Sequence, residues 1–263
     1  MMETKRCPVV SVVTVNFNEA DKLAQTIRSV RAQTYSNVDF IVIDGGSSDG
    51  SADLLKQNKE GVDHWVSEKD RGLYDAMNKG VLASKGEWIV FMNSGDLFCQ
   101  NNVIEKIFSV DRSRENVLYG HHQVRYQSVR KNIYANSPLS LLWKGMIFSH
   151  QSMFTRRQLL IDNPFDFENY PTAADYNLIF TLKGQQTFTK VDLIISSVEP
   201  GGVSDTKRLF SIKQRYEVLK AHMCLDFKKR AYYFFLFIDT PIKIVLRKIM
   251  PQWLFEFLLK LKR

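Results

Sequence analysis

Apolar segments of strand length alternate with segments of helical periodicity over the first hundred residues of the chain. Four segments have the β-branched, apolar character of buried strands: residues 9–17, 38–44, 63–68 and 87–92. Three segments carry helical patterns: residues 18–33, 52–58 and 73–84. This alternation predicts an α/β fold, with an open, mostly parallel sheet covered by helices on both faces. With 263 residues, 44% of them hydrophobic, the chain can bury such a core.

Ligands of sheets of this kind bind beyond the carboxyl ends of the strands. At those ends the chain has four loops rich in Asp, Asn, Ser and Gly: "NFNEAD", "DGGSSDG", "SEKDRGLYD" and "NSGDLF". Any one of these loops is explained more simply by turns and helix caps. Because all four are expected to meet at one edge of the sheet, they predict a crevice for the hydroxyls and phosphates of a nucleotide.

Five stretches carry a resemblance to a known family: "VSVVTVNFNEADKLAQTIRSVRAQTY", "VIDGGSSDGS", "EKDRGLYDAMNKG", "FMNSGD" and "SHQSMF". In this order and spacing they resemble the family 2 glycosyltransferases, most closely the short bacterial enzymes that build exopolysaccharide, colanic-acid-type and O-antigen repeat units. The resemblance covers residues 9–205. It implies a GT-A fold, a nucleotide-diphospho-sugar donor, a divalent metal and transfer with inversion at the anomeric carbon.

The resemblance also implies which residues contact the donor. These are Asn16, Asn18, Glu19, Asp44, Asp70, Arg71, Gly72, Asn93, Ser94, Gly201, Gly202, Lys207 and Arg208. A carboxylate at a strand end, such as Asp44, can accept hydrogen bonds from ribose hydroxyls or a base N–H. Arg71 offers a forked donor to phosphate, and the glycine pair lets the backbone approach phosphate closely. Turn formation and surface exposure are the simpler explanations for each.

Asp96 and His150 are the candidate metal ligands. In "FMNSGD", Asn93 and Gly95 stand where the family often has carboxylates, so Asp96 is the acid that remains. Mg²⁺ and Mn²⁺ are often held by one or two carboxylates, while phosphates and water complete the coordination shell. His150 precedes an apolar strand, where it could ligate the metal or donate to the leaving group, and a purely structural role is the alternative.

Asp175 is the candidate general base. The stretch "NYPTAADYNLIFTLKG" resembles the acidic dipeptide of the family at a helix start, with Ala174 where Glu is common. An acceptor hydroxyl must lose its proton as its oxygen attacks the anomeric carbon, and a positioned carboxylate can take that proton. The alternative is an acid favoured at a helix N-terminus by the helix dipole.

The net charge of +8 belongs to the C-terminal region. Residues 207–263 hold 14 Lys and Arg against 4 Asp and Glu, whereas residues 1–206 hold 22 against 24. We therefore expect a catalytic domain in residues 1–206 and a basic, aromatic, amphipathic helical extension in residues 207–263. Such an extension suits an anionic membrane surface. Packing on the catalytic domain, or on a sister subunit of a homo-oligomer, is the competing interpretation of the segment "WLFEFLLKLKR" in particular.

The sequence thus predicts an inverting, metal-dependent glycosyltransferase acting on a saccharide or a polyprenyl-diphosphate-linked acceptor in cell-surface polysaccharide synthesis. Scattered cysteines and the absence of a cleavage site suit the cytoplasm, at the inner face of the membrane. A degenerate nucleotide-sugar-binding scaffold is the alternative, motivated by Asn93, Gly95 and Ala174. A nucleotidyltransferase is disfavoured because the chain lacks an early Gly-rich phosphate loop. Nucleic acid is disfavoured because the basic excess lies in an apolar-rich tail.

Overall fold

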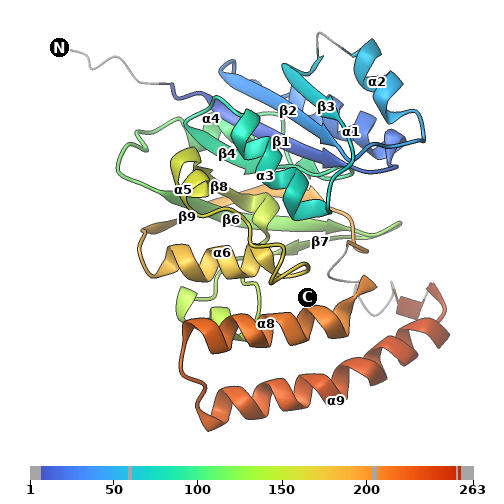
Figure 1. Ribbon diagram of the computed structural model, residues 1–263, viewed down its shortest axis with the longest axis vertical. Coiled ribbons are helices and arrows are strands. Elements are labelled where there is room, and N and C mark those ends of the chain that lie inside the picture. The colour runs from blue at the N-terminus through green and yellow to red at the C-terminus, as the bar shows by residue number, and fades with distance from the viewer. Residues whose placement is uncertain (1–6, 59–60, 203–205, 253, 256–263) are drawn as a thin grey trace.

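The computed structural model describes residues 7–58, 61–202, 206–252 and 254–255. Within them, nine strands form one sheet in the order β3-β2-β1-β4-β8-β6-β9-β5, with β7 paired to β6 (Figure 1). The strands are β1 Val10–Asn16, β2 Val38–Asp44, β3 His64–Ser67, β4 Trp88–Phe91, β5 Leu97–Phe98, β6 Val117–Arg125, β7 Arg130–Ile133, β8 Met153–Arg156 and β9 Phe188–Val198.

Strands β1 to β4 form the parallel half of the sheet that the sequence predicts. β1 lies between β2 and β4 and is parallel to both, and β3 extends the sheet beyond β2. The second half is mixed: β8 is antiparallel to β4 and β6, while β9 is parallel to β6 and antiparallel to β5. The four predicted strands and the α/β class are confirmed.

Helices cover both faces of this sheet (Figure 1). The α-helices are α1 Ala20–Arg31, α2 Ser51–Gln57, α3 Leu73–Ala83, α4 Val103–Ile107, α5 Arg157–Asp162, α6 Ala174–Lys183, α8 Arg208–His222 and α9 Phe227–Ile249. Two short 3-10 helices, η2 Leu139–Lys144 and η3 His150–Ser152, precede β8. The three helices predicted before β4 are α1, α2 and α3.

Alternate residues of the central strands point into two separate apolar cores. Val12 of β1 packs in the core that includes Leu23 of α1, whereas Val13 packs in the core that includes Met77 of α3. Helix α3 approaches β1 closely at Gly80, where a Cβ atom would lie 2.3 Å from a side-chain carbon of Val13. The period-two burial of the strands therefore places one layer of helices on each face.

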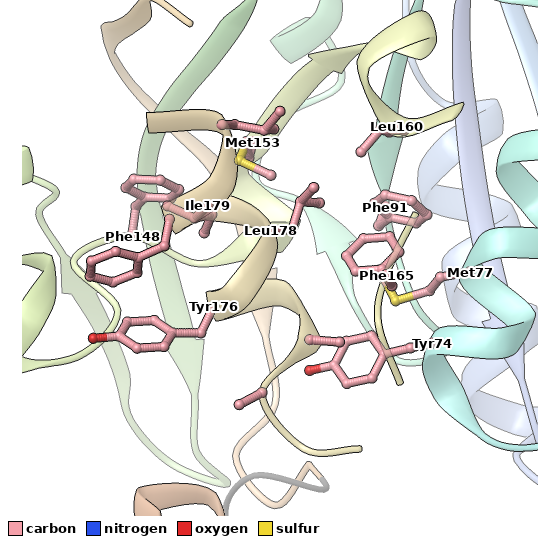
Figure 2. Close-up of a cluster of buried hydrophobic side chains, with 14 of the residues drawn as sticks. Tyr74, Met77, Phe91, Phe148, Met153, Leu160, Phe165, Tyr176, Leu178 and Ile179 are labelled. Atoms are coloured by element: carbon pink, nitrogen blue, oxygen red, sulfur yellow. The ribbon is translucent and has the colours of Figure 1, made fainter. Parts of the chain in front are cut away.

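The core beneath α3 extends to α6 and aligns the first turns of these two helices. Figure 2 shows Tyr176, Leu178 and Ile179 of α6 in this core, with Tyr74 of α3 stacked on Phe165 at a centroid distance of 5.5 Å. Burial of each such side chain stabilises the fold by about 1.5–3 kcal/mol. The N-terminal turns of α3 and α6, which carry functional candidates, are thereby fixed against each other.

Helices α8 and α9 form further layers below α6 (Figure 1). Ile212 and Leu219 of α8 and Tyr233 of α9 are buried in the same core as α6. The hydroxyl of Tyr233 donates to the carbonyl of Trp143 at 3.1 Å. The predicted C-terminal helical extension is therefore present, while its last segment, residues 253–263, lies outside the described residues except for 254 and 255.

Candidate active site

Asn16 and Asp44 end the neighbouring strands β1 and β2, in register with each other. The amide of Asn16 donates to Asp44 at 2.7 Å and accepts from the hydroxyl of Ser94 at 2.8 Å. Asp44 also accepts from the backbone N–H of Ser47 at 3.0 Å and the hydroxyl of Ser67 at 2.6 Å. Burial would raise the pKa of Asp44, but these hydrogen bonds hold the pKa below its ordinary value. Asp44 is fully buried, and its hydrogen bonds connect the ends of β1 and β3 with the loop after β2. Its contact with a nucleotide stays a prediction.

Asn18 and Glu19 lie at the predicted edge of the sheet, in the loop after β1. Asn18 adopts a left-handed backbone conformation with a φ of 53°, and its side-chain oxygen accepts from the N–H of Ser48 at 2.8 Å. Glu19 immediately precedes α1 and forms an ion pair of 2.6 Å with Lys22. Both side chains shape the loop, and their predicted donor contacts remain predictions.

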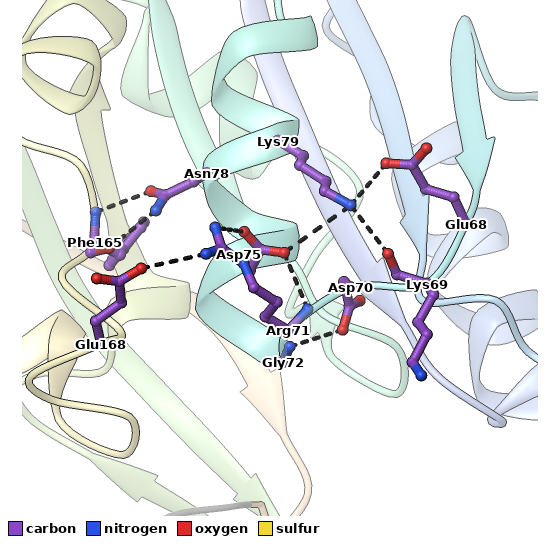
Figure 3. Close-up of polar contacts among 10 residues, drawn as sticks. All are labelled: Glu68, Lys69, Asp70, Arg71, Gly72, Asp75, Asn78, Lys79, Phe165 and Glu168. Atoms are coloured by element: carbon purple, nitrogen blue, oxygen red, sulfur yellow. Dashed lines mark hydrogen bonds and ion pairs between the residues drawn. The ribbon is translucent and has the colours of Figure 1, made fainter.

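The guanidinium of Arg71 pairs with two carboxylates. Its guanidinium donates to Asp75 at 3.0 Å and to Glu168 at 3.2 Å, as Figure 3 shows. The same guanidinium lies 4.6 Å from the ring centroid of Phe167. Two carboxylates would thus compete with phosphate for this arginine, and its predicted donor contact stays a prediction.

Asp70 and Gly72 shape the start of α3. The carboxylate of Asp70 accepts from the N–H of Gly72 at 2.8 Å (Figure 3). Gly72 has a φ of 120°, which a residue with a side chain rarely adopts. The other oxygen of Asp70 lies 2.6 Å from where a Cβ atom on Gly45 would stand. This loop therefore touches the loop after β2, as the convergence of the strand ends predicts.

Asp96 follows β4 in a buried loop held against α1. Its carbonyl accepts from the hydroxyl of Thr26 at 2.9 Å, and its carboxylate accepts from the side chain of Gln151 at 3.0 Å. Burial raises the pKa of Asp96 to about 6, against the opposing effects of Gln151 and the nearby charges of His150 and Arg125. In the same loop, the side-chain oxygen of Asn93 is buried without a hydrogen-bond partner among the described residues.

His150, Asp175 and Tyr74 form a second set of polar contacts. His150 Nδ1 lies 3.1 Å from one carboxylate oxygen of Asp175, and the hydroxyl of Tyr74 donates to the other at 2.8 Å. The N–H of Tyr176 donates to Asp175 at 2.8 Å. Burial would raise the pKa of Asp175, but His150 and Tyr74 hold the pKa below its ordinary value. Asp175 is therefore ionised at neutral pH.

Adjacent residues of η3 connect the two sets, because Gln151 contacts Asp96 and His150 contacts Asp175. We call the set Asp96, Gln151, His150, Asp175 and Tyr74 the catalytic cluster. Three of its members are predicted from the sequence. Gln151 belongs to the quoted "SHQSMF" stretch but had no assigned role, and no sequence signal distinguishes Tyr74 from the core tyrosines.

The predicted donor loop near residue 201 is only partly described. Gly201, with a φ of 107°, and Gly202 are exposed, with open space around their Cα atoms. Lys207 immediately precedes α8. Arg208 begins α8 and lines a pocket of about 170 Å³ that also includes Asp175. Arg208 and Asp175, the candidate base, thus line the same pocket.

A sequence profile described as Glycosyl transferase family 2 matches residues 11–174, more than half of the chain. The chain belongs to this family. An uncharacterized glycosyltransferase of Mycobacterium tuberculosis (strain CDC 1551 / Oshkosh) is 44% identical over 98 residues, 37% of this chain and 37% of the relative. A PGL/p-HBAD biosynthesis glycosyltransferase of Mycobacterium bovis (strain BCG / Pasteur 1173P2) is 26% identical over 208 residues, 76% of this chain and 80% of the relative. The chain thus matches little more than a third of the first relative's length.

Solved structures place this family 2 chain in the GT-A fold. A mannosyltransferase from Pyrobaculum calidifontis, in complex with GDP-Man and Mn²⁺, has a TM-score of 0.66 at 13% identity, over 96% of this chain and 79% of that one. S. aureus TarS in complex with UDP has a TM-score of 0.64 at 15% identity, over 86% of this chain and 69% of that one. At such identities the likeness shows the fold, and the predicted GT-A architecture is confirmed.

The carboxylate of Asp96 and an unpaired ring nitrogen of His150 suit a divalent cation. His150 Nε2 is buried without a hydrogen-bond partner among the described residues, while Nδ1 faces the carboxylate of Asp175. A histidine held in this way by a carboxylate keeps a lone pair on its other nitrogen for a metal. No group of three or more His, Cys, Asp or Glu residues within the described ranges could hold a metal. The two side chains therefore fit a cation whose other ligands come from phosphate and water.

Proposed function

We propose that this chain is an inverting glycosyltransferase that moves a sugar from a nucleotide-diphospho-sugar to an acceptor hydroxyl. The observation that carries the proposal is the catalytic cluster, in which Gln151 and His150 join Asp96 to Asp175. It combines a candidate cation site with an ionised carboxylate, at the edge of the sheet where α/β folds bind their ligands. These are the two functions that such a transfer requires.

The donor is proposed to bind across the ends of β1, β2 and β4, with its diphosphate at Asp96 and His150. The predicted donor-binding residues include Asn16, Asp44 and Ser94, which are linked to one another by hydrogen bonds. A bound Mg²⁺ or Mn²⁺ would neutralise the charge that develops on the departing nucleoside diphosphate. The complexes of the structural neighbours with GDP-Man and Mn²⁺ or with UDP are consistent with such a donor.

Asp175 is proposed to be the general base. The acceptor hydroxyl gives its proton to Asp175 as its oxygen bonds to the anomeric carbon, and the bond from that carbon to the diphosphate breaks. Attack from the face opposite the leaving group inverts the configuration. The hydrogen bonds of Tyr74 and the contact of His150 hold the carboxylate in one orientation, which favours a geometry close to the transition state.

The acceptor is proposed to be lipid-linked and to be met at the inner face of the cell membrane. This proposal is supported by the outward face of α9, which we call the apolar face of α9. It consists of exposed apolar side chains: Phe227, Phe234, Phe235, Ile238, Ile242, Val245 and Ile249. The helix has six Lys or Arg residues and one Asp, which favours an anionic surface. Among the described residues, no helix combines the length and hydropathy needed to cross a membrane.

Binding of nucleotide sugars, with and without Mn²⁺, tests this proposal. We expect one or more members of a nucleotide-sugar panel to raise the melting temperature, because a ligand of the native state stabilises it by mass action. Mn²⁺ alone should bind weakly, since Asp96 and His150 supply only part of its ligands, and should bind tightly once the donor is present. Asp96→Asn should abolish the additional effect of Mn²⁺. A panel in which no nucleotide sugar changes the melting temperature would contradict the proposal.

A further inference from the structure

A pocket beside Asp175 has two arginines and a hydroxyl in its wall. Arg208, Ser211 and Arg215 are spaced by three and four residues along α8, so they share one face of the helix. Asp175 forms another part of the wall. The other lining residues come from the segment before η3 and from the start of α6: Met146, Thr172, Ala173 and Tyr176. None of the loops that follow β1 to β4 contributes to this pocket.

Two polar groups of α8 in this pocket lack hydrogen-bond partners in the described part of the chain. The Nε of Arg215 and the hydroxyl of Ser211 are buried, and neither has a hydrogen-bond partner among the described residues. Ser211 is only 4% exposed. Leaving such a buried polar group unpaired is unfavourable, because it loses its hydrogen bonds to water without gaining others. No ion pair joins Arg208 or Arg215 to a carboxylate in the described part of the chain.

The neighbours of Arg215 hold it in place without pairing with it. The hydroxyls of Tyr176 and Tyr233 both donate to backbone carbonyls, those of Leu142 and Trp143. At Gly145, where φ is 137°, a Cβ atom would lie 2.9 Å from a terminal nitrogen of Arg215. A glycine at that position thus leaves room for the guanidinium. The pocket therefore combines two arginines with two buried donors, Arg215 Nε and the Ser211 hydroxyl, that have no acceptor among the described residues.

We propose that this pocket binds the phosphate or diphosphate group of the acceptor, with Arg208 and Arg215 as forked donors and Ser211 as a hydroxyl donor. The inference rests on the proposed function and names the substrate class of that site. The diphosphate of the donor is already accounted for by Asp96 and His150, so the α8 pocket serves a second anion. An acceptor anchored here places its sugar hydroxyl near Asp175, the candidate base.

The position of α9 is consistent with an acceptor whose phosphate is attached to a lipid. Tyr216 of α8 packs on Tyr233 of α9 at a centroid distance of 5.2 Å, so the two helices form one layered unit. The apolar face of α9 lies on the outer side of this unit, at the proposed membrane surface. A diphosphate held at that surface could enter the pocket while its lipid stays in the membrane. A water-soluble sugar phosphate would offer the same anion without the lipid.

Calorimetric titration of the full chain with inorganic pyrophosphate, in the presence of a chelator, tests the site without turnover. We expect Arg208→Gln and Arg215→Gln each to weaken binding at least tenfold. The matched control is Lys213→Gln, which removes an exposed positive charge of α8 outside the pocket and should leave the affinity unchanged. Arg208 is exposed, so its substitution removes no buried contact, and Arg215→Lys should recover part of the affinity.

Farnesyl diphosphate distinguishes the two sources of the anion. Binding at least as tight as that of pyrophosphate, and equally sensitive to Arg208→Gln, assigns the site to a lipid-linked acceptor. Binding of pyrophosphate alone assigns it to a soluble phosphorylated acceptor. Unchanged pyrophosphate affinity in both arginine variants would overturn the proposal.

Kinetics separate this inference from the proposed function. The family resemblance implies a donor contact for Arg208, whereas its place in the pocket reassigns it to the acceptor. In a transfer assay, Arg208→Gln should therefore raise the KM for the acceptor at least tenfold and leave the KM for the donor unchanged. A rise in the KM for the donor instead would assign the pocket to the donor and overturn the inference. Failure of the wild-type chain to transfer any sugar would refute the proposed function, while the pyrophosphate titration would still report on the pocket.

Discussion

Asp175 is the residue on which the proposed chemistry depends most directly. Asp175→Asn removes the proton acceptor but keeps the shape of the side chain, so we expect kcat to fall by about 10²–10⁴-fold. Tyr74→Phe removes one hydrogen bond to the carboxylate, and its smaller effect should appear in kcat more than in the KM for the donor. Steady-state kinetics with a fixed acceptor measures both.

The control for this substitution is Asp53→Asn, at an exposed position of α2 whose carboxylate pairs with Lys56. It changes the same functional group far from the catalytic cluster and should leave kcat intact. Wild-type kcat in Asp175→Asn would exclude Asp175 as the base.

His122 of β6 should make stability depend on pH. Burial lowers its pKa to about 4, aided by the neighbouring His121, and its Nδ1 is buried without a partner among the described residues. The unfolded chain therefore binds a proton at a higher pH than the native chain does. His122 consequently destabilises the fold as pH falls from its ordinary pKa towards 4.

We predict that His122→Leu reduces the loss of unfolding free energy between pH 7 and pH 4.5 by about 1–3 kcal/mol relative to wild type. Urea denaturation at the two pH values measures this difference. His64→Leu, at an exposed position of β3, is the matched control. Equal pH dependence in wild type and His122→Leu would contradict the account of His122.

The sequence identified the acids of the site better than it identified their partners. Asp96 and Asp175 stand in motifs, whereas Arg215 acquires its significance through a buried Nε that has no hydrogen-bond partner among the described residues, which no local pattern reveals. The ion pairs of Arg71 were missed for a related reason. Its partner Glu168 is 97 residues away in the chain, so the competition for its guanidinium could not be read from the loop itself.

At the scale of elements, the apolar face of α9 is the feature that most needs a partner. Phe234 and Ile238 are 62% and 50% exposed, one turn apart on this face. Burial of such side chains in a membrane interface is worth about 1.5–3 kcal/mol each. We therefore predict that replacing both by Ser lowers partitioning to anionic vesicles at least tenfold.

Vesicle sedimentation measures this partitioning, and Leu82→Ser is the control, because Leu82 is an exposed apolar residue of α3 at 69% exposure. Partitioning that is unchanged in the double variant would contradict the membrane assignment. Loss of a dimer in the double variant, seen by analytical ultracentrifugation, would instead assign the face to a second copy of the chain.

The elements of the first half could be predicted because their apolar periods are clear and because strands that alternate with helices pair in parallel. The second half lacks this advantage. Strand β9 pairs with β6 about 70 residues earlier, with register shifts near His121, and β5 is two residues long. Sequence periodicity carries no information about such distant pairing, so the mixed half of the sheet was not predicted in detail.

At the scale of the whole molecule, three surfaces are involved: the proposed donor site, the α8 pocket and the apolar face of α9. The proposed donor site lies at the ends of β1 to β4, and the α8 pocket has Asp175 in its wall. Helix α9, with its exposed apolar side chains, lies on the outer side of α8 (Figure 1). The GT-A fold followed from the family resemblance. The relation between the pocket and α9 did not, because the packing of α8 on α6 and α9 is set by tertiary contacts.

Transfer of radiolabelled sugar from a nucleotide-sugar panel to lipids extracted from bacterial membranes tests the central claim most directly. We predict that label enters the lipid fraction with wild-type protein and Mn²⁺, that a chelator prevents transfer, and that the product has the inverted anomeric configuration. Binding of a donor without transfer to any acceptor would contradict the claim, and would indicate a nucleotide-sugar-binding scaffold instead of an enzyme.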